Sequence, residues 1–403
     1  MIIAALKKFV NRRGYAMKEA SAIYTTRAVS DLAISLIGIY LPIYIYQLSL
    51  KNQLFGSSEV INGLVWICLF YALISVVVLL VIAFFIENIF NTFHLKNSLV
   101  IGILFRIVSL VFLLSAEKQP LLLILSGIFW GARIPFYWIP YHIFFMRRAD
   151  DGDHKFGSEI SKQSFFSGIA TSLAPLLGGL IITNLGFNTL YMLSIVLLLA
   201  ASLPILVYVK EQKHSPHKFK KVWREYLGNK KYLKTTIALA GRVTSAIIFA
   251  IFWSVMLYLK LQDFVEIGFL KTFSGIVATV LLISVGTVID RNGKGLLHAI
   301  SVTINSALHL SRLFIISPAA YYLNNILDKI NASAYGTCFI AATYEKVDGK
   351  HASNFITYRE VALHTARLFV LLSCVGIMLL TGSWMWVFVV AAVGSGLTFL
   401  INF

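Results

Sequence analysis

Three groups of charged and aromatic side chains interrupt otherwise apolar stretches of the sequence. In the first group, Glu360, His364 and Arg367 follow at steps of four and three residues, so a helix presents all three on one face. A carboxylate, an imidazole and a guanidinium on one face can relay a proton or hold a charged solute, and they can also lock two helices together as a structural ion pair. We predict proton coupling for Glu360 and His364, and solute binding for Arg367.

The second group lies in a stretch that contains two prolines, each of which removes a backbone donor and loosens a helix. Arg133, Tyr137 and Tyr141 follow there at four-residue steps. A guanidinium can bind a carboxylate or a phosphate through two parallel hydrogen bonds. We therefore predict that these three side chains bind solute. The alternative for Arg133 is an ion pair with an acid on a facing helix, such as Asp328.

The third group forms a polar face that would line a cavity. One side of a helix would carry Asn324, Asp328, Asn331 and Tyr335. We predict that all four contact solute and that Asp328 is a further candidate for carrying the proton. Alternatively, Asp328 and the adjacent Lys329 are partnered for stability. Asp31 completes the coupling candidates, although its proximity to Arg27 also fits an ion pair at the membrane boundary.

The elements that position these groups are hydrophobic enough to cross a membrane. The 403 residues are 58% hydrophobic and only 13% charged, whereas a soluble domain carries about 25% charged residues. The apolar residues form uninterrupted blocks, and a block of about 20 residues matches the hydrocarbon layer of a bilayer, which is about 30 Å thick. The composition therefore predicts an all-α membrane protein and argues against a soluble enzyme.

Twelve such blocks are predicted to cross the membrane as two six-helix bundles. The N-terminal bundle covers 1–209, a basic linker covers 210–234, and the C-terminal bundle covers 235–403. Similar residues recur about half a chain apart, as Arg106 and Arg312 do, which indicates duplicated halves. The predicted spans are 28–50, 59–86, 98–116, 120–146, 163–183, 187–209, 235–259, 266–289, 296–316, 318–342, 357–381 and 384–402.

Positive charge concentrates in the segments on one side of these spans. The segments 1–27, 147–162 and 210–234 carry six, four and nine Lys and Arg, and the side that holds both termini reaches 24 against four on the other side. Because Lys and Arg favour the cytoplasmic side, both termini and the linker are predicted to be cytoplasmic. The net charge of +17 is thereby explained without nucleic acid as a partner. The three cysteines fall inside spans without metal spacing, so we predict no metal and no cofactor.

A loop between the eighth and ninth predicted spans carries a specific spacing of small and charged residues. It reads Gly-x-x-x-Asp-Arg-x-Gly-Lys, at Gly286, Asp290, Arg291, Gly293 and Lys294. The pattern resembles the loop signature of the major facilitator superfamily. A small first residue permits close helix approach, and the second glycine permits a sharp reversal. The counterpart in the first half, at 86–90, keeps only one acid.

A second motif lies in the fifth predicted span. Pro175, Gly178 and Gly179 stand where the same superfamily carries Gly-x-x-x-Gly-Pro-x-x-Gly-Gly, with Ala170 and Ala174 in place of two glycines. In that family the motif is often associated with antiporters, and ordinary packing of small residues between helices explains it equally. The resemblance implies two six-helix bundles around a central cavity, alternating access, and gating roles for both motifs.

Together these patterns predict a monomeric secondary transporter in the cytoplasmic (inner) membrane of a prokaryote, in contact with lipid, a small solute and protons. Seven bases against three acids within spans favour an anionic or zwitterionic organic solute. These residues are Arg106, Arg133, Arg242, Arg312, Lys329, Arg359 and Arg367 against Asp31, Asp328 and Glu360. No ATP-binding motif occurs, so coupling to an ion gradient follows by elimination, with facilitated diffusion left open. The alternatives are a drug or metabolite exporter, a lysophospholipid transporter and a transporter-derived sensor.

Overall fold

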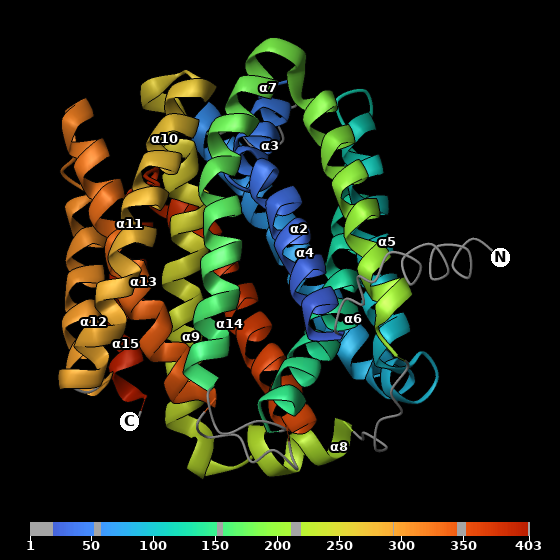
Figure 1. Ribbon diagram of the computed structural model, residues 1–403. Helices are drawn as coiled ribbons and strands as arrows, with labels where there is room; N and C mark the ends of the chain where they lie inside the picture. Colours follow the sequence, from blue (N-terminus) through green and yellow to red (C-terminus); the bar gives the residue numbers. More distant parts are fainter. Residues whose placement is uncertain are drawn as a thin grey trace.

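The computed structural model describes residues 19–51, 58–150, 156–210, 219–292, 294–344 and 352–401, and every regular element in these ranges is helical. Most of the helices run lengthwise through the molecule (Figure 1). They are α2 (Glu19–Gly38), α3 (Tyr40–Leu50), α4 (Glu59–Asn91), α5 (His94–Ser115), α6 (Leu122–Asp150), α7 (Phe156–Tyr208), α9 (Leu233–Ile248), α10 (Ser254–Leu261), α11 (Phe264–Asn292), α12 (Lys294–Ser311), α13 (Pro318–Tyr344), α14 (Ala352–Thr381) and α15 (Val387–Leu397).

The helices fall where the apolar blocks predict them. Each expected span overlaps a helical segment of the described residues, and eight segments are long and apolar enough to cross a membrane. One of the eight holds two expected spans, α12 and α13 are more polar, and α15 is only 11 residues long. A multi-pass membrane protein is therefore supported, while the number of twelve spans stays a prediction.

Local chemistry explains where the chain reverses. Within α7 the chain turns at Gly186, whose φ of 80° is the left-handed conformation that glycine adopts without strain. Between α10 and α11, Gln262 also has a positive φ, and the Asp263 carboxylate accepts from the backbone N–H of Val265 at 2.7 Å. A carboxylate at this place satisfies donors that the first turn of a helix leaves free.

The outer faces of the helices carry large apolar side chains that no other part of the described chain covers. Phe84, Leu121 and Leu380 are 73%, 76% and 88% exposed. A water-soluble monomer seldom exposes broad apolar surface, so these faces are suited to lipid. Backbone polar groups in lipid must be satisfied within the segment, which is why helices form here.

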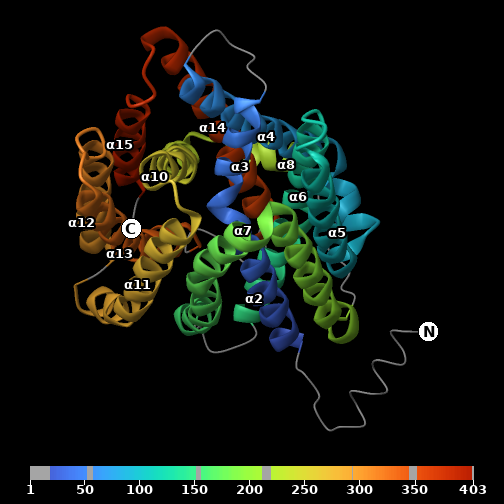
Figure 2. The same cartoon turned by 90° about the horizontal axis from the view of Figure 1, so that it is seen from above.

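Most helices of 19–208 and most of 233–400 gather on separate sides of the molecule, while α14 lies beside α4 of the first group (Figure 2). Within the first group, α2 packs on α7 and α5 packs on α6; within the second, α9 packs on α15 and α12 packs on α13. The groups meet where α4 packs on α14 and α7 packs on α11. Whether they act as two rigid bundles is a question of motion and stays a prediction.

The two ends of the molecule are distinguished by their connections. The short helix α8 (Phe219–Val222) and the turn after it lie across one end, called here the linker end, and α7 reverses at the opposite end, called the hairpin end (Figure 1). The linker docks on the start of α14, because the Tyr226 ring stacks on Tyr358 with centroids 5.4 Å apart. The amide nitrogen of Asn354 donates to Glu225 at 3.2 Å in the same contact.

Candidate functional site

The predicted row on α6 forms one continuous face. The rings of Tyr137 and Tyr141 are parallel with centroids 6.0 Å apart, and the Arg133 guanidinium lies 5.0 Å from the Tyr137 ring centroid. Near the linker end, Arg27 of α2 forms an ion pair with Asp31 and lies over the Trp138 ring at 4.2 Å. Asp31 also interacts electrostatically with Arg133. The face of α6 is thus joined to α2 by charges of both signs.

The predicted row on α14 also lies on one face, as the spacing requires. Glu360 is 3.9 Å from His364 and 3.9 Å from Arg359, and its carboxylate is within electrostatic reach of Arg367. The helix α14 packs against α4, α9 and α6. Arg359 and His142 of α6, which stand next to the two predicted rows, lie within electrostatic reach of each other, and α14 contacts α6.

Arg106 of α5 was recognised in the sequence but given no role, and the structure places it beside these rows. It is 1% exposed, and its guanidinium carbon lies 3.4 Å from the centroid of the Trp130 ring of α6. Tyr71 of α4 interacts electrostatically with both Arg106 and Arg367. Trp130 and Arg133 are three residues apart on one helix, and this spacing places both side chains on a single face. This is the signal in the sequence that groups them.

These arginines carry hydrogen-bond donors without acceptors. Within the described ranges, Arg106 Nε and Nη1, Arg133 Nε and Arg367 Nε have no hydrogen-bond partner, and neither does the hydroxyl of Tyr191. Buried polar groups are normally paired, and a concentration of unpaired donors in one region indicates a place where a polar molecule binds.

The polar face of α13 is placed differently. Asp328 pairs at 2.5 Å with Arg312, the residue directly after α12, and not with Arg133. Asn324 accepts from Arg312 Nε at 2.9 Å, and Asn331 donates to the Ser301 carbonyl at 2.9 Å. Tyr335 donates to Thr398 at 3.2 Å. All four predicted residues therefore bond to α12, to Arg312 directly after it or to the turn after α15, and the structure does not bring them to the α6 and α14 rows.

The small residues of α7 make close contacts with two other spans. A Cβ atom on Gly178 would lie 2.5 Å from the Leu36 carbonyl oxygen of α2, and one on Gly179 would lie 2.3 Å from the Phe264 carbonyl oxygen of α11. The Tyr40 hydroxyl donates to the Pro175 carbonyl at 2.6 Å and is 3.1 Å from the Phe264 carbonyl. This motif therefore lies at a contact between the two groups of helices.

The other predicted gating motif is described only in part. Gly286, Asp290 and Arg291 lie in the last turns of α11, Lys294 begins α12, and Gly293 lies outside the described residues. The motif thus stands at the connection between these two helices, as the sequence predicts, and its gating role stays a prediction.

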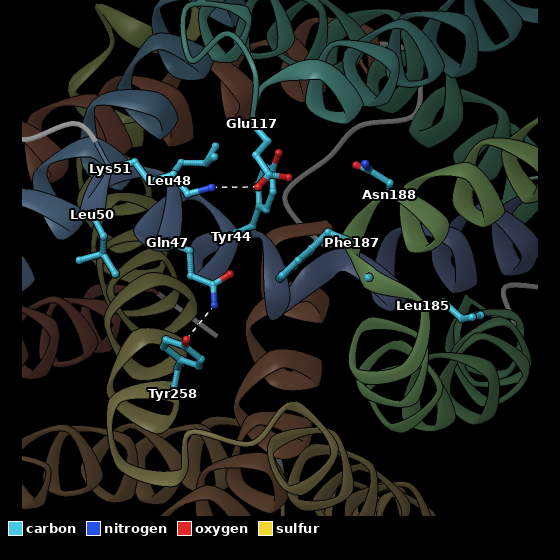
Figure 3. Close-up of a pocket in the computed structure, with 11 residues that line it drawn as sticks. Tyr44, Gln47, Leu48, Leu50, Lys51, Glu117, Leu185, Phe187, Asn188 and Tyr258 are labelled. Carbon is cyan, nitrogen blue, oxygen red and sulfur yellow. Dashed lines mark hydrogen bonds and ion pairs between the residues drawn. The ribbon is translucent and has the colours of Figure 1, made fainter.

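A pocket of about 540 Å³ opens at the hairpin end (Figure 3). Lys51 and Glu117 form an ion pair of 2.9 Å at its edge, and the Gln47 amide nitrogen donates to the Tyr258 hydroxyl at 2.7 Å across it. Tyr44 and Phe187 form the inner wall. The Tyr44 ring packs edge-on against Tyr191, with centroids 5.4 Å apart, and Tyr191 interacts electrostatically with Arg106. The aromatic pair therefore connects the lining of this pocket with the surroundings of Arg106.

Lipid-facing helices around a buried charged interior define a polytopic transporter of small molecules, not an enzyme. The sequence matches the Major Facilitator Superfamily over residues 23–356, and the chain belongs to that superfamily of membrane transporters. A comparison with curated proteins finds no match.

Three solved structures share this fold at low sequence identity. The human organic anion transporter MFSD10 (TETRAN) superposes with a TM-score of 0.69 at 13% identity, over 95% of this chain and 99% of that one. A POT family transporter in complex with 5-aminolevulinic acid gives 0.72 at 9% identity, over 95% of both chains. The E. coli fucose:proton symporter gives 0.64 at 12% identity, over 95% of this chain and 97% of that one. At these identities the likeness concerns the fold.

Proposed function

We propose that this chain moves a small anionic or zwitterionic organic solute across the cytoplasmic membrane of a prokaryotic cell by alternating access, driven by protons. The observation that carries the proposal is the set of buried arginine donors without acceptors on α5, α6 and α14. A guanidinium is a planar donor that fits carboxylate and phosphate groups. Its burial within a membrane is costly unless a counter-charge or water is supplied.

The balance of charge favours a negatively charged group on the solute. Five arginines with described side chains stand in this region against two carboxylates, which leaves three positive charges when the histidines are neutral. These residues are Arg27, Arg106, Arg133, Arg359 and Arg367 against Asp31 and Glu360. A solute carboxylate or phosphate would offset part of this excess.

Glu360 is the side chain best placed to couple solute to protons. It is 5% exposed and lies within electrostatic reach of Arg367, with His364 at 3.9 Å. A solute anion that binds Arg367 competes with Glu360 for that positive charge. Binding of solute therefore favours protonation of Glu360 or His364, and release of solute favours loss of that proton, which is the linkage that a coupled transporter requires.

The contacts between the two groups of helices are where we expect the helices to move during transport. Gly178 and Gly179 permit α7 to approach α2 and α11 closely near the hairpin end, and separation of these helices would open the interior there. The transporters of similar fold include an organic anion transporter and a fucose:proton symporter, which agrees with the proposed solute class and with proton coupling.

Reconstitution in vesicles tests the proposal. Arg367→Ala should lower solute uptake about 10- to 100-fold, because hydrogen bonds to charged groups contribute about 1.5–3 kcal/mol. Glu360→Gln should keep solute exchange and lose stimulation by an imposed proton gradient. Glu266→Gln is the matched control, because Glu266 accepts from Tyr322 at the edge of α11, away from the arginines.

Other outcomes separate the alternatives. Uptake that is unchanged in both Arg367→Ala and Glu360→Gln rejects these roles. Solute movement only against protons would identify an exporter, binding of lysophospholipid instead of soluble anions would identify a lipid transporter, and specific binding without flux would identify a sensor.

A further inference from the structure

Arg106 is held in a way that leaves its hydrogen-bonding edge free. Its guanidinium lies on the face of Trp130, with the carbon 3.4 Å from the ring centroid. A guanidinium that stacks on an aromatic ring uses its flat face, and its N–H groups point outward in the plane. Within the described ranges, Nε and Nη1 of Arg106 have no acceptor and no carboxylate lies within ion-pair distance.

The second half of the chain shows what a neutralised arginine looks like in this fold. Arg312 is 0% exposed and its guanidinium also lies over aromatic rings, 4.6 Å from Phe249 and 4.9 Å from Trp253. Asp328 pairs with it at 2.5 Å and Asn324 accepts from its Nε. Arg312 therefore has an acid of its own, as a buried charge normally requires.

The helix that corresponds to α13 in the first half is α6, and it offers no such acid. Asp328 stands ten residues after Pro318, the first residue of α13, and Arg133 stands eleven residues after Leu122, the first residue of α6. The first half thus presents a second arginine at the depth where the second half presents an aspartate. Arg106 and Arg133 interact unfavourably with each other, and an anion bound near both would relieve this repulsion.

Arg367 is the third arginine of this region. It belongs to α14, the helix that packs on α4 and α6, and it shares Tyr71 as a neighbour with Arg106. Tyr71, Trp130 and Tyr191 supply aromatic surface around the guanidinium groups, and the Tyr191 hydroxyl has no partner in the described part of the chain.

We propose that Arg106, Arg133 and Arg367 together bind a solute with two negative charges, either a dicarboxylate or an organic phosphate, against the aromatic surface of Trp130 and Tyr71. The inference rests on the proposed transport function and narrows its substrate class. It assigns Arg106 as a third solute-binding residue. A single carboxylate can satisfy one or two guanidinium groups through parallel hydrogen bonds. Of the two acids in the region, Asp31 already pairs with Arg27, so three guanidinium groups share Glu360, and their excess positive charge calls for a second negative charge on the solute.

Binding of matched probes to the purified full-length chain tests this. Isophthalate carries two carboxylates on an aromatic ring, and monomethyl isophthalate has nearly the same shape with one. Phenyl phosphate is the corresponding phosphate. We expect isophthalate or phenyl phosphate to bind at least tenfold more tightly than the monoester. Arg106→Gln should weaken binding of whichever dianion binds more tightly by about 10- to 100-fold. The same variant should keep its affinity for the monoester, and this retained binding also shows that the variant is folded.

Two further variants test whether the charge of Arg106, the planar shape of its guanidinium or its position is needed. Arg106→Lys keeps the charge without the planar fork and should recover only part of the preference for the dianion. Arg242→Gln removes an arginine of α9 that lies on Tyr335, outside this group, and should keep the preference.

Equal affinity of the unmodified chain for isophthalate and its monoester, with no preference for phenyl phosphate, would overturn the dianion site and leave anion transport intact. A preference that survives in Arg106→Gln would overturn the role of Arg106. Binding of none of the three anions would count against the proposed function as well.

Discussion

Buried arginines illustrate at the residue scale how one side chain type can serve stability or function. Arg312 and Arg106 are both buried and both stack on tryptophan. The difference lies in the partner: Arg312 pairs with Asp328, whereas Nε and Nη1 of Arg106 have no acceptor among the described residues. A buried charge that is paired within the protein contributes to the structure, whereas a buried charge without a partner is available to bind a ligand.

The Arg312–Asp328 pair therefore predicts a loss of stability when it is broken. Asp328→Asn leaves a fully buried guanidinium without its counter-charge, which costs about 3–5 kcal/mol. Thermal unfolding of the purified protein measures this. Glu117→Gln breaks the exposed Lys51–Glu117 pair and should cost about 1 kcal/mol or less.

The double variant Arg312→Gln with Asp328→Asn decides between the two interpretations of Asp328. Removing both charges should restore most of the stability, because no unpaired buried charge remains. Transport that recovers with stability would show a structural pair, and transport that stays lost in a stable protein would show that Asp328 carries solute or proton.

At the element scale, the contacts of α7 depend on how closely its backbone approaches the neighbouring helices. The Cβ positions at Gly178 and Gly179 lie against backbone carbonyls of α2 and α11, and a backbone oxygen cannot move aside as a flexible side chain can. Small residues permit such close approach of helices in membranes. Pro175 contributes its carbonyl as an acceptor for Tyr40, which joins three helices at one point.

Gly179→Ala should therefore force α7 and α11 apart and reduce transport more than stability. The added methyl would meet the Phe264 oxygen at 2.3 Å. Initial rates of uptake measure the effect, with labelling of a cysteine at Gln47 by a membrane-impermeant maleimide as a reporter of opening at the hairpin end. Gly376→Ala is the control, since nothing lies within 4 Å of that Cβ position; an equal loss of transport in both variants would contradict this account.

At the scale of the whole molecule, orientation follows from the distribution of charge. The linker end carries the helix α8 and the hairpin end carries Glu117. If the linker is cytoplasmic, a cysteine that replaces Glu117 should react with an impermeant maleimide in intact cells, and one that replaces Lys220 should react only after permeabilisation. The described native cysteines, Cys68, Cys338 and Cys374, are buried and add little background. Labelling of both sites from outside would contradict the predicted odd number of spans between them.

Hydropathy and local periodicity were sufficient to predict much of this protein. Lipid requires every backbone polar group to be bonded within its own segment, so the apolar blocks predict helices at nearly the observed bounds. Residues three or four apart share a helix face, and for this reason Glu360, His364 and Arg367, or Arg133 and Tyr137, could be grouped without a structure.

The neighbours of each face were decided only by the tertiary structure. How a helix is rotated about its axis depends on side-chain packing against helices that are distant in sequence, and a single sequence does not record that rotation. The polar face of α13 therefore proved to pack on α12, with Asp328 paired to Arg312, and Arg106 proved to lie beside Arg133 and Tyr71 without an acid. Burial of a charge is visible in hydropathy, but the presence or absence of its partner is a property of the packed protein.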